Sequence, residues 1–484
     1  MKNIYTRFFT LSAFVLSVTA CSLNEAPSDG ILSDQITLTP LTLTAATAGN
    51  YSTALSADFI RNLFYMNELP GDNVSLSGTT SDALFFSYNY GHLPNQANSY
   101  QIWQQCNKII AGANKLIPVI DEKKSVEFSQ LKGENLFLRA WSHFILVNIF
   151  GKAYTLQGIN PTTELGIPVV LSYDATAKPK RNTLKETFDA IIADLTQAAT
   201  LMQSDKSSVY ASKEVAYALL SRVYLYSGNN TKAIEYANLA INSGRYSLAT
   251  ANDYEKYFTI QPENNPETIF AIKFAQKDDL GYGSIGSMYN ADGGYGELYA
   301  SRTYMKLLNK YPADLRHSFV KVQLNASATD TLRRNGTPKI FVYKFSNQGP
   351  VPSLASPAII RLSEMYLNRA EAQAKLGNDA QAIDDVNLIR QRAGLSGAEL
   401  YSVSDLKGHA TVLDVVLEER QLELSFEGFR PLDLFRNNRT MERNYPGIHP
   451  KVNGKQTILP TNPRIVHLIP EKEMLLNPNL VPNQ

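Results

Sequence analysis

Residues 212–244, SKEVAYALLSRVYLYSGNNTKAIEYANLAINSG, decide the fold class of this chain. Small and aromatic residues recur there at three- and four-residue spacing, which predicts two amphipathic helices with facing stripes made by Ala216, Leu220, Tyr224, Ala233, Ala237 and Ala240. Gly228 should end the first helix, and Asn230 or Thr231 should cap the second. Alanine facing tyrosine across a helix pair is typical of tetratricopeptide repeats.

The turn of this hairpin recurs near the C-terminus. Residues 377–383, GNDAQAI, match residues 228–234, GNNTKAI, at the Gly, Asn, Ala and Ile positions. The helix before this second turn is expected over 358–376, with Ser356 as its cap and Pro357 as its first residue. Two such hairpins predict a mostly α fold, a tetratricopeptide-like helical-repeat scaffold with long loop-rich and short β insertions.

Composition indicates a globular protein with an unusual aromatic balance. Hydrophobic residues make up 44% and charged residues 19% of the chain, and there are 26 Tyr and 21 Phe against 2 Trp. The formal net charge is +1, and it becomes −1 if Lys2 and Arg7 are removed with a leader. This near-neutrality disfavours nucleic acid as a partner, because phosphate binding needs a basic surface.

The N-terminus reads as an export signal. Lys2 and Arg7 are followed by an apolar run over residues 8–18 and by the sequence VTAC, residues 18–21. This order predicts a signal peptide over residues 1–20, and a cysteine after small residues is typical of a lipobox. Cys21 is then the lipid anchor, and 21–45 is a lipidated tether. The alternative is an ordinary leader cut after Ala20.

Further elements follow from periodicity, and two long loops interrupt them. Helices are expected over 46–67, 100–120, 131–150, 184–202 (capped by Thr183) and 411–427, a strand over 268–274, and a β-hairpin within 318–348 that turns at Asn335-Gly336. The loops are 71–98 and 281–300, which are rich in Gly, Tyr, Ser and Asn. Cys106 has no partner cysteine in the mature chain and is expected to be a buried apolar residue.

Several blocks together resemble one family. They are FLRA (137–140), RLSEMYLNRAEA (361–372), LEERQLELSFEGFRPLDLFR (417–436) and LIPEKEMLLNPNLVPNQ (468–484). Their motifs and order, with Cys21 at the front, resemble the SusD/RagB family of Bacteroidetes outer-membrane nutrient-binding lipoproteins. Pro482 stands where the family's ending often has Gln. The resemblance covers nearly the whole mature chain.

The resemblance implies a fold, a partner and a place. It implies a single SusD-like domain over 46–484, with an N-terminal helical part (46–250), a loop and β insertion (251–355) and a C-terminal SusD/RagB part (356–484). The implied partner is a SusC-like TonB-dependent transporter, over which the protein sits as a lid on the outer membrane, lipid-anchored and surface-facing. The implied ligand is a glycan or oligosaccharide, with peptides as the alternative.

The charged signature invites an enzyme interpretation. Four glutamates, Glu418, Glu419, Glu423 and Glu427, could supply a hydrolase's paired carboxylates. On a helix, however, Arg420 lies one turn from Glu423 and two from Glu427, so we interpret the block as structural ion pairs. No G-x-S-x-G nucleophile elbow occurs either. We therefore predict a protein that is not an enzyme.

The sequence offers little to bind a metal or cofactor. The histidines lack H-x-x-x-H spacing, and the cysteines offer no pair. His143 in an apolar helix is interpreted as a hydrogen-bonded core residue, and Asp292 lies in no EF-hand order. We expect no cofactor and no metal.

Ligand binding is predicted on the two loops, where tyrosine rings can cover sugar C–H faces and Asn or Asp can bind hydroxyl groups. The candidate ligand-binding residues are Asp72, Asn73, Tyr88, Tyr90, Tyr282, Tyr289, Asn290 and Tyr295, with Asn89, Asp292 and Tyr299 as further members of the same loops. The alternative is that these side chains pack the loops or face the transporter. The scarcity of Trp favours a short or curved ligand.

Four functions are therefore compared. The first is a surface-anchored lipoprotein that captures glycans for import. The second is the same architecture serving peptides. The third is a secreted glycoside hydrolase, which would release reducing sugar. The fourth is a tetratricopeptide adaptor that binds only protein.

Overall fold

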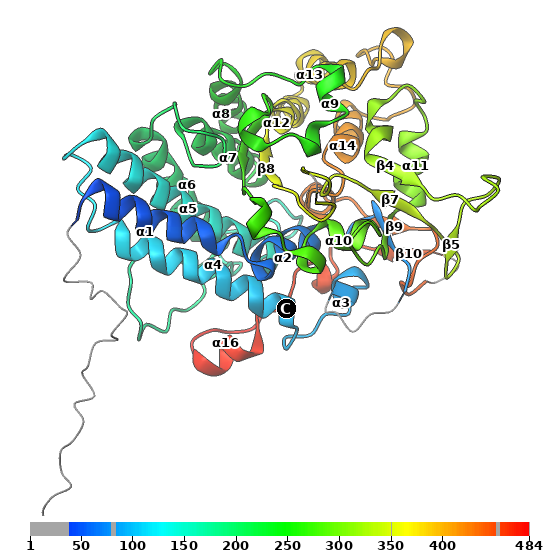
Figure 1. The fold of residues 1–484 in the computed structure, drawn as a ribbon. Coiled ribbons are helices and arrows are strands. Elements are labelled where there is room, and N and C mark those ends of the chain that lie inside the picture. Colours follow the sequence, from blue (N-terminus) through cyan, green and yellow to red (C-terminus); the bar gives the residue numbers. More distant parts are fainter. Residues whose placement is uncertain (1–37, 79–83, 350, 452–454, 484) are drawn as a thin grey trace, which may run out of the picture.

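The computed structural model describes residues 38–78, 84–349, 351–451 and 455–483 (Figure 1). The predicted signal peptide, Cys21 and the tether as far as residue 37 lie outside these ranges. Helices dominate the described residues, and the strands pair only as two-stranded antiparallel ribbons. The predicted mostly α fold is confirmed.

The N-terminal part is a layer of long helices: α1 Pro40–Thr53, α2 Ala57–Glu68, α4 Ala97–Leu116, α5 Val126–Phe150 and α6 Leu184–Leu201. The helix predicted over 46–67 is in fact two, because the chain breaks after Thr53 and restarts at a new cap. The Ser56 hydroxyl accepts a hydrogen bond from the Phe59 amide at 3.2 Å. Helix α6 starts as predicted, with Thr183 and Glu186 forming a capping box.

Both predicted hairpins are present. Helices α7 Lys213–Tyr226 and α8 Asn230–Ile241 form the first, and α12 Leu362–Lys375 and α13 Asp379–Arg392 form the second. Their turns use Gly228 at φ 80° and Gly377 at φ 78°, where glycine avoids the strain of a Cβ. The cap of α8 is Asn229, not Asn230 or Thr231: its side chain accepts from the Lys232 amide at 3.2 Å. Helix α8 packs against α12, so the two hairpins are neighbours in space.

The helix before the second turn starts later than predicted. Residues Ala358–Arg361 form strand β8, which pairs antiparallel with β2, Thr268–Ala271. The Ile272 amide extends this pairing by donating to the Pro357 carbonyl at 3.2 Å. Pro357 therefore precedes a strand instead of starting a helix. The pairing joins the insertion to the C-terminal part.

The remaining elements are short, and all but β1 and α3 belong to the insertion and the C-terminal part. The helices are α3 Leu84–Tyr88, α9 Ala251–Tyr254, α10 Gly286–Tyr289, α11 Arg302–Leu308, α14 Val412–Glu423, α15 Arg430–Arg436 and α16 Glu471–Leu476; the strands are β1 Val74–Leu76, β3 Leu298–Ala300, β4 Val320–Val322, β5 Arg333–Arg334, β6 Thr337–Pro338, β7 Ile340–Val342, β9 Met441–Arg443 and β10 Gln456–Ile458. The predicted β-hairpin is confirmed, since β4 pairs with β7 and β5 with β6 around a turn at Asn335 and Gly336.

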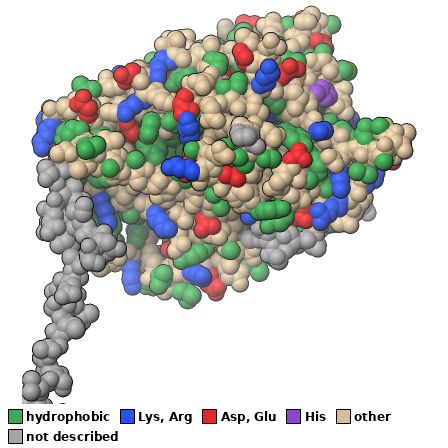
Figure 2. Space-filling model, viewed as in Figure 1, with side chains coloured by type: hydrophobic (Ala, Val, Ile, Leu, Met, Phe, Trp, Pro, Cys, Tyr) green, Lys and Arg blue, Asp and Glu red, His purple; other side chains and the backbone are tan. Residues whose placement is uncertain are grey.

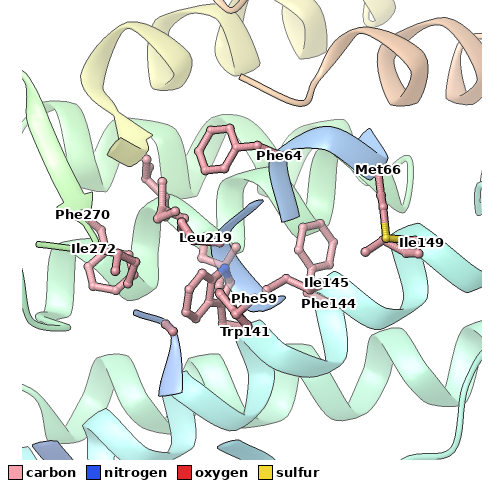
Figure 3. Close-up of a cluster of buried hydrophobic side chains, with 14 of the residues drawn as sticks. Phe59, Phe64, Met66, Trp141, Phe144, Ile145, Ile149, Leu219, Phe270 and Ile272 are labelled. Carbon is pink, nitrogen blue, oxygen red and sulfur yellow. The ribbon is translucent and has the colours of Figure 1, made fainter. Parts of the chain in front are cut away.

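Helix α5 is the centre of the core, as its apolar circumference predicts. Phe59 of α2 packs edge-on against Trp141 of α5 with ring centroids 5.4 Å apart, and Phe270 of β2 meets the same indole (Figure 3). Each such buried side chain contributes roughly 1.5–3 kcal/mol. Cys106 of α4 is buried and free, as predicted, and burial raises the pKa of its thiol.

The signature helix α14 is the hub of a buried ion-pair network. Glu423 accepts from Arg361 at 2.7 Å and from Arg392 at 2.5 Å, and Glu419 accepts from Arg316 at 2.7 Å. These arginines come from β8, from α13 and from the insertion, so one side of α14 connects the C-terminal part with the insertion. Burial opposes ionisation of Glu423, but the surrounding cations hold its pKa well below the ordinary value.

The partners of Arg420 differ from those predicted. Its guanidinium donates to Asp433 at 2.8 Å and to Asn368 at 2.8 Å, whereas Glu427 pairs with Lys344 and Arg361. Neighbouring positions on a buried helix face different elements, so the pairs form between elements instead of along α14. The block is structural, as we interpreted it, but its bonds are tertiary.

Candidate functional site

The loop over residues 281–296 folds around one serine. The Ser287 carbonyl accepts from the amides of Tyr295 at 2.5 Å and Gly296 at 3.0 Å, while its hydroxyl donates to the Tyr282 carbonyl at 2.8 Å. Gly294 crosses directly over this residue, since a Cβ there would lie 2.4 Å from the Ser287 oxygen. Ser287 thus holds the start of the loop, at Tyr282, close to its end, at Tyr295 and Gly296.

Two predicted tyrosines meet on the surface of this loop. The rings of Tyr282 and Tyr295 lie 4.9 Å apart between centroids, in an edge-to-face arrangement. Tyr282 is 58% exposed and Tyr295 is 53% exposed, although large aromatic side chains usually bury most of their surface. The pair is a pre-formed aromatic platform of the type that binds the apolar face of a sugar.

The predicted residues of the first loop are buried instead. Asp72 forms a two-pronged ion pair with Arg430, at 2.7 and 3.1 Å. The Asn73 side chain accepts from Gln421 of α14 at 2.9 Å and donates to Glu68 at 2.9 Å. Both polar groups are used inside the protein, so we correct the prediction and remove them from the candidate site.

Tyr88 and Tyr90 are buried, and both rings lie close to Arg443. The guanidinium of Arg443 lies 4.1 Å from the centroid of the Tyr88 ring and 5.8 Å from that of Tyr90. The Tyr88 hydroxyl lies 3.0 Å from His449 Nδ1, and the Tyr90 hydroxyl donates to the Pro70 carbonyl. Burial raises the pKa of both phenols. Neither ring offers a face to a ligand, which corrects the prediction.

Two predicted residues of the second loop are also internal. Tyr289 is fully buried, and its ring stacks on Phe345 at 6.0 Å and meets Phe426 edge-on at 5.9 Å. The Asn290 side chain accepts from the Asp292 amide at 3.0 Å and so closes a local turn. These two residues support the loop beneath the platform, and they too are removed from the candidate site.

Asp292, which is near the platform in sequence, has a hydrogen-bond partner that the sequence did not reveal. The Asp292 carboxylate accepts a hydrogen bond at 2.9 Å from the hydroxyl of Tyr343, the residue that directly follows β7. Partial burial and this hydrogen bond raise the pKa of Tyr343. The two residues are far apart in sequence, so only tertiary structure brings them together.

A larger concave surface lies elsewhere and contains none of the predicted residues. This groove encloses about 750 Å³ between α4, residues 168–179 and the C-terminal segment around α16, whereas a groove beside α1 encloses about 260 Å³. Its floor includes Trp103 and Asn107, and its walls include Tyr173 and Leu476. Periodicity gave no signal for it, because one wall is the irregular segment 168–179 and the other is the distant, short helix α16 with the residues after it.

The charged side chains and the histidines of the described residues form no metal site. Charged side chains of both signs are interspersed over the face in Figure 2. Within the described part of the chain, no three His, Cys, Asp or Glu side chains are placed to hold a metal ion. His143 is a hydrogen-bonded core residue, as predicted: its Nε2 accepts from the Val170 amide at 3.3 Å, and burial lowers its pKa to about 3. None of the helices in residues 38–483 that the structure describes combines the length and apolar character needed to cross a membrane.

Comparison with known proteins gives consistent matches over the whole chain. Residues 42–225 match a family model described as starch-binding and associating with the outer membrane, and residues 203–484 match that of the SusD family. A SusD-like protein P2 of Formosa agariphila is 26% identical over 100% of this chain and 99% of its own length.

Solved structures agree. A SusD superfamily protein of Bacteroides thetaiotaomicron superposes with a TM-score of 0.81 at 29% identity, covering 92% of this chain and 100% of the other. A putative sugar binding protein of Bacteroides vulgatus gives 0.79 at 28% identity, covering 93% and 99%. The fold, the C-terminal signature and these matches agree: the chain belongs to the SusD family.

Proposed function

We propose that this protein captures a glycan or oligosaccharide at the cell surface and delivers it to a SusC-like TonB-dependent transporter. The observation that carries the proposal is the exposed Tyr282–Tyr295 pair, fixed by Ser287 on the loop-rich side of a SusD fold. Two rings at 61° to one another form a bent platform, which suits a curved or short ligand more than a flat polymer surface. The starch-binding description of the matching family supports this ligand class.

The test removes the platform and leaves the fold. The mature chain with Cys21→Ser is screened on a glycan array, and the best ligand is titrated against Tyr282→Ala, Tyr295→Ala and the double variant. Each single variant should weaken binding about tenfold, because a stacked aromatic face is worth roughly 1–2 kcal/mol.

Tyr210→Ala is the matched control, since Tyr210 is also exposed but lies outside the loop. Unchanged affinity in the double variant contradicts the platform. Binding to a peptide library with none to the array favours the peptide alternative, and release of reducing sugar by the purified protein favours the hydrolase.

We further propose that Cys21 carries the lipid that anchors the protein to the outer membrane. The signal-like residues 1–20 and the outer-membrane description of the matching family support this. Cys21→Ala should move the protein from the membrane fraction to the soluble fraction. Co-purification of the wild-type lipoprotein with a β-barrel transporter tests the proposed partner.

A further inference from the structure

The groove between α4 and α16 is bordered by exposed apolar side chains. Leu171 is 51% exposed and Tyr173 is 48% exposed on one wall, while Leu476 of α16 is 70% exposed on the other. Leaving such surface in water costs about 25 cal/mol per Å² relative to burying it. Apolar side chains gathered around a concave surface indicate a binding site for another segment.

The first wall is held rigid by buried polar groups. Arg139 of α5 forms a bidentate pair with Asp194, at 2.8 and 2.7 Å, and donates to the Leu171 carbonyl at 2.9 Å. Asn114 of α4 donates to the carbonyls of Val170 at 3.0 Å and Ser172 at 3.3 Å. Because this wall is fixed from beneath, the groove stays open without an occupant.

The second wall is tied to the first by the C-terminal motif. Asn477 donates to the Pro179 carbonyl at 2.8 Å, and Asn479 donates to the Lys178 carbonyl at 2.8 Å. Figure 1 shows α16 lying beneath α4, apart from the helices of the two hairpins. The groove is therefore pre-formed, which lowers the entropy cost of binding a segment there.

We propose that the groove binds residues 21–37, the N-terminal part of the chain's own tether. Helix α1 starts at Pro40, separated by two residues from this segment, and packs along α4, the helix that forms the groove floor. Leu43 of α1 clusters with Leu116 and Ile120, and Ala111 of the floor lies roughly 7.5 Å along α4 from Leu116. An extended segment of the tether's length spans roughly 55 Å, so it reaches the groove.

The tether has the composition to fit. Ile31, Leu32 and Ile36 are spaced through the otherwise polar residues 28–37 and can cover Leu171, Tyr173 and Leu476. The charged tether residues are all acidic, Glu25, Asp29 and Asp34. Lys115, beside the groove, lies 4.2 Å from the centroid of the Tyr173 ring, and Lys178 lines the wall. Of the two acidic lining residues, Asp174 already accepts hydrogen bonds from Thr176, and burial raises the pKa of Glu473.

Docking shortens the free chain between the lipid on Cys21 and the folded part of the protein. With residues 31–36 bound, the free leash to Cys21 shortens to roughly 30 Å, and the α16 side of the fold faces the attachment point. Because the tether is linked to the groove, its effective concentration is of millimolar order, and weak contacts are enough to hold it. Only this consequence rests on the proposed lipid anchor; the docking itself needs neither lipid, glycan nor transporter.

Hydrogen exchange on the mature chain with Cys21→Ser tests the docking. Peptides covering 170–178 and 471–480 should exchange at least threefold more slowly than in the same chain carrying Ile31→Ser, Leu32→Ser and Ile36→Ser. Peptides from α8 serve as the internal reference and should not differ. Equal exchange in the two chains overturns the proposal, even if glycan binding at the platform is intact.

A cross-link gives an independent readout that does not depend on stability. Leu32→Cys combined with Leu476→Cys should form a disulfide under mild oxidation, since Cys106 is buried and Cys21 is replaced. The control pairs Leu32→Cys with Leu239→Cys, an exposed position on α8. Cross-linking no faster than the control overturns the proposal. Slower exchange on adding the glycan, with no effect of the tether substitutions, assigns the groove to ligand instead.

Discussion

The loops over 71–98 and 281–296 have similar compositions but opposite environments. Both are rich in Tyr, Asn, Gly and Asp, and both looked suited to bind sugar. In the first loop, Asp72 pairs with Arg430, and the rings of Tyr88 and Tyr90 pack against Arg443 in the interior. In the second, no arginine reaches Tyr282 or Tyr295 through a contact the structure describes, and both rings stay exposed. A buried cation elsewhere in the chain therefore decides which loop keeps its aromatic side chains exposed.

The largest difference between the loops should appear when each loses one aspartate. Asp72→Ala leaves Arg430 without its carboxylate in a mostly buried position and should lower the free energy of unfolding by about 3–5 kcal/mol. Asp292→Ala in the exposed loop should change it by about 0.5 kcal/mol or less. Urea denaturation measures both. Similar losses in the two variants would show that burial does not distinguish the loops.

A second substitution breaks the exposed loop without touching its tyrosines. Gly294→Ala places a Cβ 2.4 Å from the Ser287 carbonyl oxygen, and this clash should cost about 1–3 kcal/mol and separate the two rings. Gly49→Ala is the control, since a Cβ within α1 meets nothing there and should stabilise by about 0.5–1 kcal/mol. Urea denaturation measures the stability of the two variants, and glycan titration measures their affinity. Full binding by the Gly294 variant would rule out Ser287 as the element that positions the platform.

Acid should weaken the buried loop through His92. His92 stacks on His467 at 4.6 Å, and burial lowers the pKa of His92 to about 4. The unfolded chain takes up the proton near its ordinary pKa of about 6.5 and the folded chain does not, so stability falls as pH drops from about 6.5 towards 4. At pH 5 the loss attributable to His92 should be about 1–2 kcal/mol.

His92→Gln should flatten this part of the pH profile. The free energy of unfolding is measured from pH 7 to pH 4 in both proteins. Parallel profiles would show that His92 is not the group that responds.

The smallest effect compares two hydroxyl groups. Tyr88→Phe leaves His449 Nδ1 without its partner in the interior and should cost about 1 kcal/mol. Tyr282→Phe, on the exposed platform, should be neutral within about 0.5 kcal/mol. Thermal melts resolve this difference. A destabilised Tyr282→Phe would mean that its hydroxyl has a structural partner.

By itself the sequence determined the helices and their class. Apolar spacing in 212–244, the glycines at 228 and 377 and the cap at Thr183 act within a few residues, so their geometry follows from local rules. The signature around α14 likewise indicated ion pairing over catalysis, because Arg420 stands among glutamates within two helical turns. The matched family agrees with these local patterns.

Tertiary structure alone decided which polar and aromatic side chains are available. Asp72 and Arg430, Tyr88 and His449, and Glu423 and Arg361 are distant in sequence and meet only after the core forms. The helix start predicted at Pro357 was wrong for the same reason, because the residues after it form strand β8, which needs β2 as its partner. Burial and ion pairing depend on the whole chain around a residue, so the same tyrosine or aspartate is a core residue in one loop and a surface residue in the other.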